Sequence, residues 1–214
     1  MNRAGPVILT VPGLNGSGPS HWQTLWETSR SDTARVDLGM WHGPHRNSWV
    51  TKLDQAVRTT DAPIILAAHG LGCLAVAWWA ELAGQAYGWP VAGALLTAPP
   101  DVDRPNAAPE LKAFGPSPTT ALPFPSILAA STDDPWISVD HAHSLAVLWG
   151  SHFVELGDCG HVNAASGVGW WDEGQELLER VINASELNSS TTPVIDARSV
   201  LAAKLDGFSY ARHL

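Results

Sequence analysis

The sequence predicts an α/β protein built on a mainly parallel sheet of about six strands, with helices on both faces. Two observations lead to this class. Apolar segments of strand length alternate with longer segments of helical periodicity along most of the chain. The strand segments are short and apolar throughout, as expected for strands buried on both faces. The 214 residues, 45% of them hydrophobic, suffice for one domain with a large core.

The elements follow one another in a regular order. Residues 7–11 form an apolar strand that ends at Pro12-Gly13, and 20–23 read as a capped helix start with Ser20 as N-cap. The same alternation continues along the chain. The further expected elements are strands at 34–38, 63–68, 91–97, 125–131 and 152–156, and helices at 48–59, 71–86, 139–149 and 170–183.

Two segments do not fit this alternation. Residues 101–122 are proline-rich and polar, with one short helix near 110–114, and are too few for a large cap domain. We therefore expect an open site. The domain is placed at 1–185, followed over 186–214 by a linker and a tail with one helix at most. The tail is either mobile, packed on its own domain, or the contact through which a homo-oligomer forms.

Composition excludes several kinds of partner. A net charge of −9 argues against nucleic acid and anionic membranes. No apolar run approaches the roughly 18 residues of a membrane span, and no signal peptide precedes the first strand, so we expect a cytoplasmic protein. Cys73 and Cys159 suggest neither a disulfide framework nor a metal site, and His42 and His45 have no third ligand nearby. No metal or cofactor is expected.

The turn Ala-His-Gly-Leu-Gly at 68–72 joins a strand to a helix. It matches small-x-Ser-x-Gly, the nucleophile elbow of α/β-hydrolases, except that Gly70 stands at the serine position. A nucleophile there adopts a strained backbone, which glycine adopts without strain. Gly70 therefore preserves the turn and removes the attacking oxygen. On this motif alone, a plain glycine-rich turn that binds phosphate remains an alternative.

The loop at 12–19 is dense in glycine, but its spacing is not GxGxxG and no Gly-Lys-Ser/Thr follows. Such a loop can instead turn a backbone N–H toward a developing oxyanion. The candidates for the oxyanion hole are the N–H groups of Leu14 and of Leu71, the residue after the nucleophile position.

Acidic and imidazole side chains follow two later strands. Asp134 lies just past the strand at 126–131, and His161 just past the strand at 153–156. With Gly70 they give the order nucleophile, acid, histidine, in which the carboxylate orients the imidazole that takes the nucleophile's proton. Asp133 is interpreted as a solvated turn or cap, and Asp158 as a turn residue.

The remaining assignments concern the surroundings of this site. His69 is interpreted as structural, and His21 as a partner of loop backbone or, less favoured, of a ligand. Asn15, Trp22 and Trp136 are assigned to substrate binding, in a pocket walled by the two tryptophans and the 101–122 segment. An acidic chain with a tryptophan-rich site favours small neutral or apolar esters or amides as substrates.

Four motifs together resemble the small serine hydrolases of the YdeN and retinoblastoma-binding-protein-9 type. They are Val-Pro-Gly-Leu-x-Gly-Ser-Gly-Pro-x-His-Trp-Gln at 11–23, Ala-His-x-Leu-Gly-Cys at 68–73, Ser-x-Asp-Asp-Pro at 131–135 and Asp-Cys-Gly-His at 158–161. The resemblance covers about residues 6–183. It implies a minimal α/β-hydrolase fold, esterase or in some members aminopeptidase-type activity, and a serine at position 70 completing a triad with Asp134 and His161.

Three explanations of Gly70 remain. The chain is a serine hydrolase whose nucleophile has been replaced, a natural pseudoenzyme that binds a small molecule or protein, or an enzyme in which another group acts. For the third, the candidates are Cys73, Ser17 and a water activated by His161. The otherwise intact site favours the first explanation.

Overall fold

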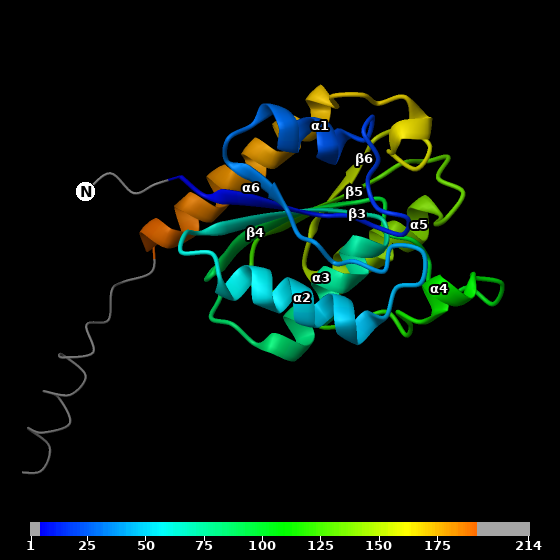
Figure 1. Cartoon of the computed structure of the whole chain (residues 1–214), viewed down its shortest axis with the longest axis horizontal. Helices are drawn as coiled ribbons and strands as arrows, with labels where there is room; N and C mark the ends of the chain where they lie inside the picture. The colour runs from blue at the N-terminus through cyan, green and yellow to red at the C-terminus, as the bar shows by residue number, and fades with distance from the viewer. Residues whose placement is uncertain (1–4, 192–214) are drawn as a thin grey trace, which may run out of the picture.

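The computed structural model describes residues 5–191 and confirms the predicted fold class. Its single sheet has the order β2-β1-β3-β4-β5-β6, and every neighbouring pair is parallel (Figure 1). The strands are β1 (Val7–Val11), β2 (Thr33–Arg35), β3 (Ile64–His69), β4 (Val91–Thr97), β5 (Ser126–Ala130) and β6 (His152–Glu155). Parallel order places all the carboxyl ends of the strands at one edge, where the predicted site residues lie.

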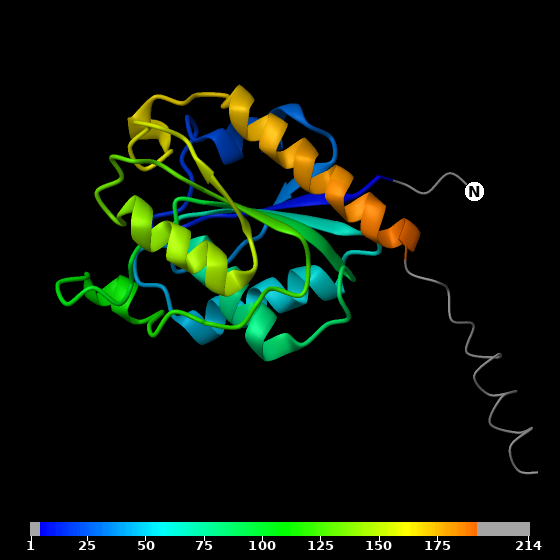
Figure 2. The same cartoon turned by 180° about the vertical axis from the view of Figure 1, so that it is seen from behind.

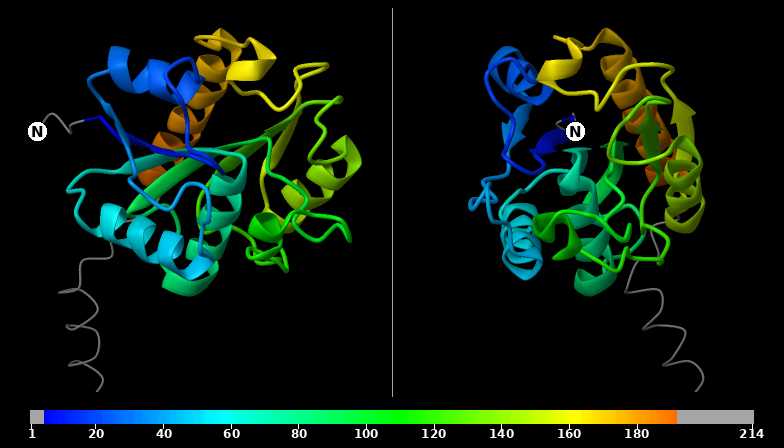
Figure 3. Two further views of the ribbon diagram at one scale, coloured as in Figure 1. Left: turned by 45° about the vertical axis from the view of Figure 1, so that its right-hand side comes forward. Right: turned by 90° about the vertical axis from the view of Figure 1, so that its right-hand side faces the viewer.

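Helices cover both faces of the sheet, as Figures 1 and 2 show from opposite sides. One face carries α1 (Trp22–Ser29) and α6 (Asp172–Thr191). The other carries α2 (Arg46–Arg58), α3 (Leu71–Ala83) and α5 (Val139–Trp149). Between β4 and β5 only α4 (Pro109–Lys112) forms, a single turn at the right-hand end of the molecule in Figure 1, the end that faces the viewer in the right-hand view of Figure 3. No large cap therefore covers the strand ends in the described part of the chain.

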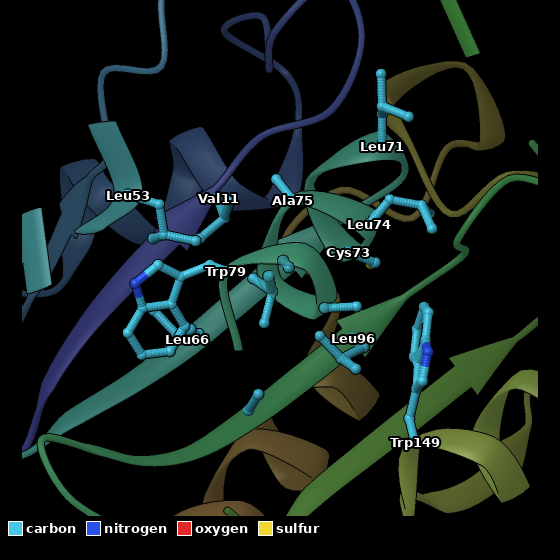
Figure 4. Close-up of a cluster of buried hydrophobic side chains, with 14 of the residues drawn as sticks. Val11, Leu53, Leu66, Leu71, Cys73, Leu74, Ala75, Trp79, Leu96 and Trp149 are labelled. Atoms are coloured by element: carbon cyan, nitrogen blue, oxygen red, sulfur yellow. The ribbon is translucent and has the colours of Figure 1, made fainter. Parts of the chain in front are cut away.

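The core consists of two apolar clusters, one on each face of the sheet. Alternation along β3 shows the division, because Ile64 and Leu66 belong to one cluster and Ile65 and Ala67 to the other. The larger cluster joins α2, α3 and α5 to the sheet, and Figure 4 shows Trp79 and Trp149 among its side chains. None of the described helices is both long and apolar enough to cross a lipid bilayer.

Some element boundaries differ from the prediction. The N-cap of α1 is His21 rather than Ser20, because the His21 ring accepts a hydrogen bond from the Gln23 N–H. Helix α6 passes the predicted domain boundary at 185 and continues to Thr191. Between residues 184 and 191 the sequence has no glycine or proline to stop it. The helix expected within 197–205 lies outside the described residues.

Candidate active site

The turn between β3 and α3 is fixed by its backbone. Gly70 has φ 54° and ψ −127°, and the positive φ favours glycine. Its N–H donates to the Thr97 carbonyl at 2.9 Å, and its own carbonyl accepts from the Cys73 N–H at 3.0 Å. The backbone of residue 70 is therefore held on both sides, by β4 and by the first turn of α3.

Close backbone approach around this turn requires two further glycines. A Cβ on Gly72 would lie 2.2 Å from the Val11 carbonyl oxygen, so α3 begins directly against the end of β1. A Cβ on Gly13 would lie 2.9 Å from the His69 carbonyl oxygen and 3.0 Å from the Leu71 nitrogen. The loop after β1 consequently rests on the elbow, with no room for a side chain between them.

This contact brings the two predicted oxyanion donors to one cavity. Leu14 and Leu71 both line it, together with Gly70. Within residues 5–191, neither the Leu14 N–H nor the Leu71 N–H has a hydrogen-bond acceptor. Two unpaired backbone donors beside one cavity are suited to stabilising a negatively charged oxygen.

Asp134 and His161 form a tight pair at the same edge. His161 Nδ1 lies 2.8 Å from Asp134 Oδ2, and the side chain of Asp134 is fully buried. The other carboxylate oxygen accepts from the Trp136 N–H at 2.9 Å. A carboxylate only accepts, so Nδ1 carries the hydrogen and Nε2 keeps a free lone pair. A Cβ on Gly70 would lie 3.5 Å from that Nε2 atom.

Asp133 has a more specific position than the solvated turn that the sequence suggested. Its Oδ1 accepts from the Ser131 hydroxyl and from the Gly160 N–H, both at 2.6 Å. The Ser131 oxygen in turn accepts from the Cys159 N–H at 2.8 Å. These hydrogen bonds, first of all the one from Ser131, lower the pKa of Asp133. The two residues tie the loop after β5 to the loop that carries His161.

Two further histidines lie in a row next to His161. His69 Nε2 donates to the His161 carbonyl at 2.9 Å, and the His69 ring lies 4.9 Å from the His161 ring. The His21 ring lies 4.6 Å from His69. Burial, then Arg35 and His161, lower the pKa of His21 to about 4. Burial also holds the pKa of His69 well below its usual value, with His21 and His161 adding to the effect.

Both of these histidines are therefore neutral at neutral pH. Of these three histidines, whose rings meet edge to face, His161 alone is paired with a carboxylate.

The cavity measures about 350 Å³, at the small end of ligand sites. Asn15 and Trp136 line it as expected, and from the segment 101–122 it receives Leu111. No Asp, Glu, Lys or Arg belongs to the described lining. The lining residues are Gly13, Leu14, Asn15, Gly16, Gly18, His21, His69, Gly70, Leu71, Pro100, Leu111, Trp136, His161, Asn163, Ala164 and Ala165.

Trp22 does not line the cavity, so its assignment to substrate binding is wrong. It is fully buried, its ring packs 4.5 Å from Trp26, and its Nε1 donates to the Val162 carbonyl. Its place in the first turn of α1 directs it into the core between that helix and α6.

Sequence reasoning missed the short helix η1 (Ala164–Ser166) as a wall of the cavity. The Asn163 side chain caps it and Ser166 completes a capping box. That Asn-x-x-Ser spacing was the available signal.

Other groups at the site give little support to a substitute nucleophile on the chain. The Cys73 thiol points to the Thr97 carbonyl, 3.4 Å away, and burial raises its pKa. Ser17 is buried and bonded to Gln23, outside the cavity lining. Among the described residues, no group of three or more His, Cys, Asp or Glu is placed to hold a metal ion.

Comparison with known proteins adds independent findings. The sequence profile described as serine hydrolase matches residues 8–180. No curated protein gives a significant match. A YdeN-like hydrolase from Pectobacterium atrosepticum is 30% identical with a TM-score of 0.71, covering 86% of this chain and 92% of that one.

Two more distant structures are alike in fold. The ydeN gene product of B. subtilis is 18% identical with a TM-score of 0.69, covering 83% of this chain and 99% of that one. Est1E from Butyrivibrio proteoclasticus is 13% identical with a TM-score of 0.56, covering 85% and 88%.

Proposed function

Because this chain belongs to the serine hydrolase family, we propose that its cavity is built to hydrolyse small neutral esters, or amides, through a serine at position 70. Asp134 and His161 complete the triad, and the N–H groups of Leu14 and Leu71 form the oxyanion hole. With Gly70 the chain lacks the oxygen that would form an acyl-enzyme, so the acyl-enzyme route is inactivated in this chain.

The observation that carries this proposal is the geometry at position 70. A Cβ there is 3.5 Å from His161 Nε2, in ordinary van der Waals contact, so a side chain fits without displacing the ring. A serine hydroxyl one bond further on is within reach of that nitrogen, whose opposite side is held by the buried Asp134. Serine at this position would therefore meet its base without rearrangement of the loops.

The cavity lining supports the choice of substrate. Because no fully charged side chain belongs to it, a charged acyl group would lose hydration without gaining an ionic partner. The cavity volume of about 350 Å³ favours a short acyl chain. Asn15 and Trp136 are the side chains best placed to contact the rest of the substrate.

Restoring the nucleophile tests the proposal. We expect Gly70→Ser to hydrolyse short 4-nitrophenyl esters and to be labelled covalently by a fluorophosphonate probe. Gly70→Ala is the matched control, because it adds the same Cβ without the oxygen and should not be labelled. A folded Gly70→Ser protein that neither turns over these esters nor reacts with the probe would reject the proposal.

A second candidate is a natural binding module that retains the pocket without turnover. It is favoured by the fit of glycine to the backbone at position 70, where φ is 54°. Calorimetric binding of a non-hydrolysable ketone analogue to the Gly70 protein, together with an inactive Gly70→Ser variant, would favour this alternative. Reading codon 70 of the native gene separates a natural glycine from an introduced one.

A further inference from the structure

We infer that the Gly70 chain, as it stands, hydrolyses activated neutral esters slowly by direct attack of water held at the place of the missing side chain. The inference rests on the proposed acyl site, but it concerns a different reaction course. No covalent acyl-enzyme forms, and the nucleophile comes from solvent.

The space for that water is open and faces the base. Outside residues 69–71, the three heavy atoms nearest to the ideal Cβ position of Gly70 are His161 Nε2 at 3.5 Å, Gly13 Cα at 3.9 Å and His161 Cε1 at 4.0 Å. Within residues 5–191, Nε2 accepts no hydrogen bond. The Cβ position is 3.5 Å from Nε2, so a water that lies about 0.3 Å closer to this nitrogen is within the roughly 2.6–3.2 Å that proton transfer requires.

The groups around the water supply the rest of the reaction. Asp134 holds Nδ1–H at 2.8 Å, so Nε2 is the basic nitrogen. The unpaired N–H groups of Leu14 and Leu71 border the same cavity and can hold the carbonyl oxygen of an ester. His69 fixes the backbone of His161 through the latter's carbonyl, which keeps the ring opposite position 70.

The atoms balance without another reactant. The water oxygen bonds to the carbonyl carbon while one water proton passes to His161 Nε2, and the carbonyl electron pair moves onto the oxygen beside Leu14 and Leu71. Collapse of the tetrahedral intermediate restores the C=O bond and breaks the bond to the leaving alkoxide. The alkoxide takes the proton from Nε2, so ester and water give acid and alcohol.

Alanine at position 70 distinguishes this course from nonspecific surface reaction. Its methyl group would lie 3.5 Å from Nε2 and occupy the place of the water. Gly70→Ser carries the same Cβ and the same backbone strain, so a folded and active serine variant shows that strain alone does not disable the site. His45, exposed and outside the cavity, supplies a control for adventitious histidine reactivity.

The experiment follows 4-nitrophenyl acetate hydrolysis by the full Gly70 chain and by His161→Ala, Gly70→Ala, Gly70→Ser and His45→Ala, each checked for folding by its thermal melt. We expect a steady rate above buffer without a burst, insensitive to fluorophosphonate. It should fall at least tenfold in His161→Ala and Gly70→Ala and be unchanged in His45→Ala, since a positioned general base contributes roughly 10²–10⁴-fold.

The outcomes separate this inference from the proposed function. A Gly70 chain no faster than buffer, beside an active Gly70→Ser variant, overturns the water route and leaves the proposed function standing. A rate retained in folded His161→Ala or Gly70→Ala also overturns it, because the reaction then occurs elsewhere. An inactive, folded Gly70→Ser variant removes the proposed function instead.

Discussion

The two halves of the candidate site are held in place by different forces. The elbow and the loop after β1 meet through backbone, at separations that exclude side chains at Gly13 and Gly72. The loops carrying Asp134 and His161 meet through side-chain hydrogen bonds, above all those of Ser131 and Asp133. Loss of a side chain should therefore disturb the elbow and the loop after β1 less than the loops that carry Asp134 and His161.

This difference explains how Gly70 can leave the site intact. The elbow keeps its shape because Thr97 and Cys73 hold the backbone of residue 70, and neither contact involves its side chain. On the other side, the side chains are themselves the connections. The elbow and the loop after β1, which we call the backbone half, should therefore be sensitive to added atoms. The loops with Asp134 and His161, the side-chain half, should be sensitive to changed hydrogen-bond donors and acceptors.

The largest effect is expected from Asp134→Asn in the Gly70→Ser background. An amide presents a donor as well as an acceptor and no longer selects the Nδ1–H form of His161. The same change in a well-studied protease lowers kcat by about 10⁴, and we expect a similar loss here. Asp133→Asn is the matched control, because Asp133 does not contact the His161 ring. Equal losses in the two variants would show that position 134 has no special role.

In the backbone half, Gly72→Ala should have the largest effect on stability. The added Cβ meets the Val11 carbonyl oxygen at 2.2 Å and the Pro12 carbonyl oxygen at 2.8 Å, so β1 and α3 must separate. We expect the free energy of unfolding to fall by about 3 kcal/mol, as for severe overpacking. Gly43→Ala, with no heavy atom within 4 Å, should change it by less than about 0.5 kcal/mol. Urea unfolding measures both, and similar values would refute the close-approach argument.

His21 lies between the two halves, and its burial predicts acid sensitivity. Its folded-state pKa of about 4 is below the ordinary 6.5, so its contribution to stability is complete above pH 6.5 and declines as the pH falls toward 4. The full loss amounts to about 3 kcal/mol. His69 acts in the same direction.

The test replaces the titrating cap by one that does not titrate. His21→Asn keeps an N-cap acceptor for α1, so its unfolding free energy should fall about 3 kcal/mol less than the parent's between pH 6.5 and 4. His45→Asn is the control, since His45 is the N-cap of α2 but makes no side-chain cap hydrogen bond. In this control, the unfolding free energy should fall between pH 6.5 and 4 by the same amount as in the parent. If the unfolding free energy of His21→Asn falls as much as the parent's, protonation of His21 is not the cause of the acid sensitivity.

Most of the fold was predictable because alternating apolar segments determine a parallel sheet, and parallel order brings the strand ends to one edge. The loops with Gly13, Gly70, Asp134 and His161 therefore meet there, as expected. The sequence did not reveal which side chains turn inward. Trp22 enters the core instead of the cavity, where its ring packs against Trp26 and its Nε1 donates to the Val162 carbonyl, a partner 140 residues away that no local pattern indicates.

Contacts between loops were also beyond the sequence pattern. The sequence assigned Asp134 to the imidazole, but it gave no sign that the neighbouring Asp133 accepts the Gly160 N–H of a loop 27 residues away. That division depends on the path of both loops after their strands. The helical stretch of α6 beyond 185 was missed for a different reason, since its polar composition resembles a linker although no residue there breaks a helix.

The smallest effect is a change in melting temperature, which we expect from substitutions at position 70, where the two halves meet. Gly70→Ser places a side chain at φ 54°, which costs about 1 kcal/mol of backbone strain and should lower the melting temperature by about 2–4 °C in a chain of this size. Gly70→Ala should fall slightly further, because only serine can donate to His161 Nε2. A serine variant that melts at or above the parent temperature would show that a side chain at position 70 causes no backbone strain. The glycine would then not be explained by its freedom to adopt a positive φ.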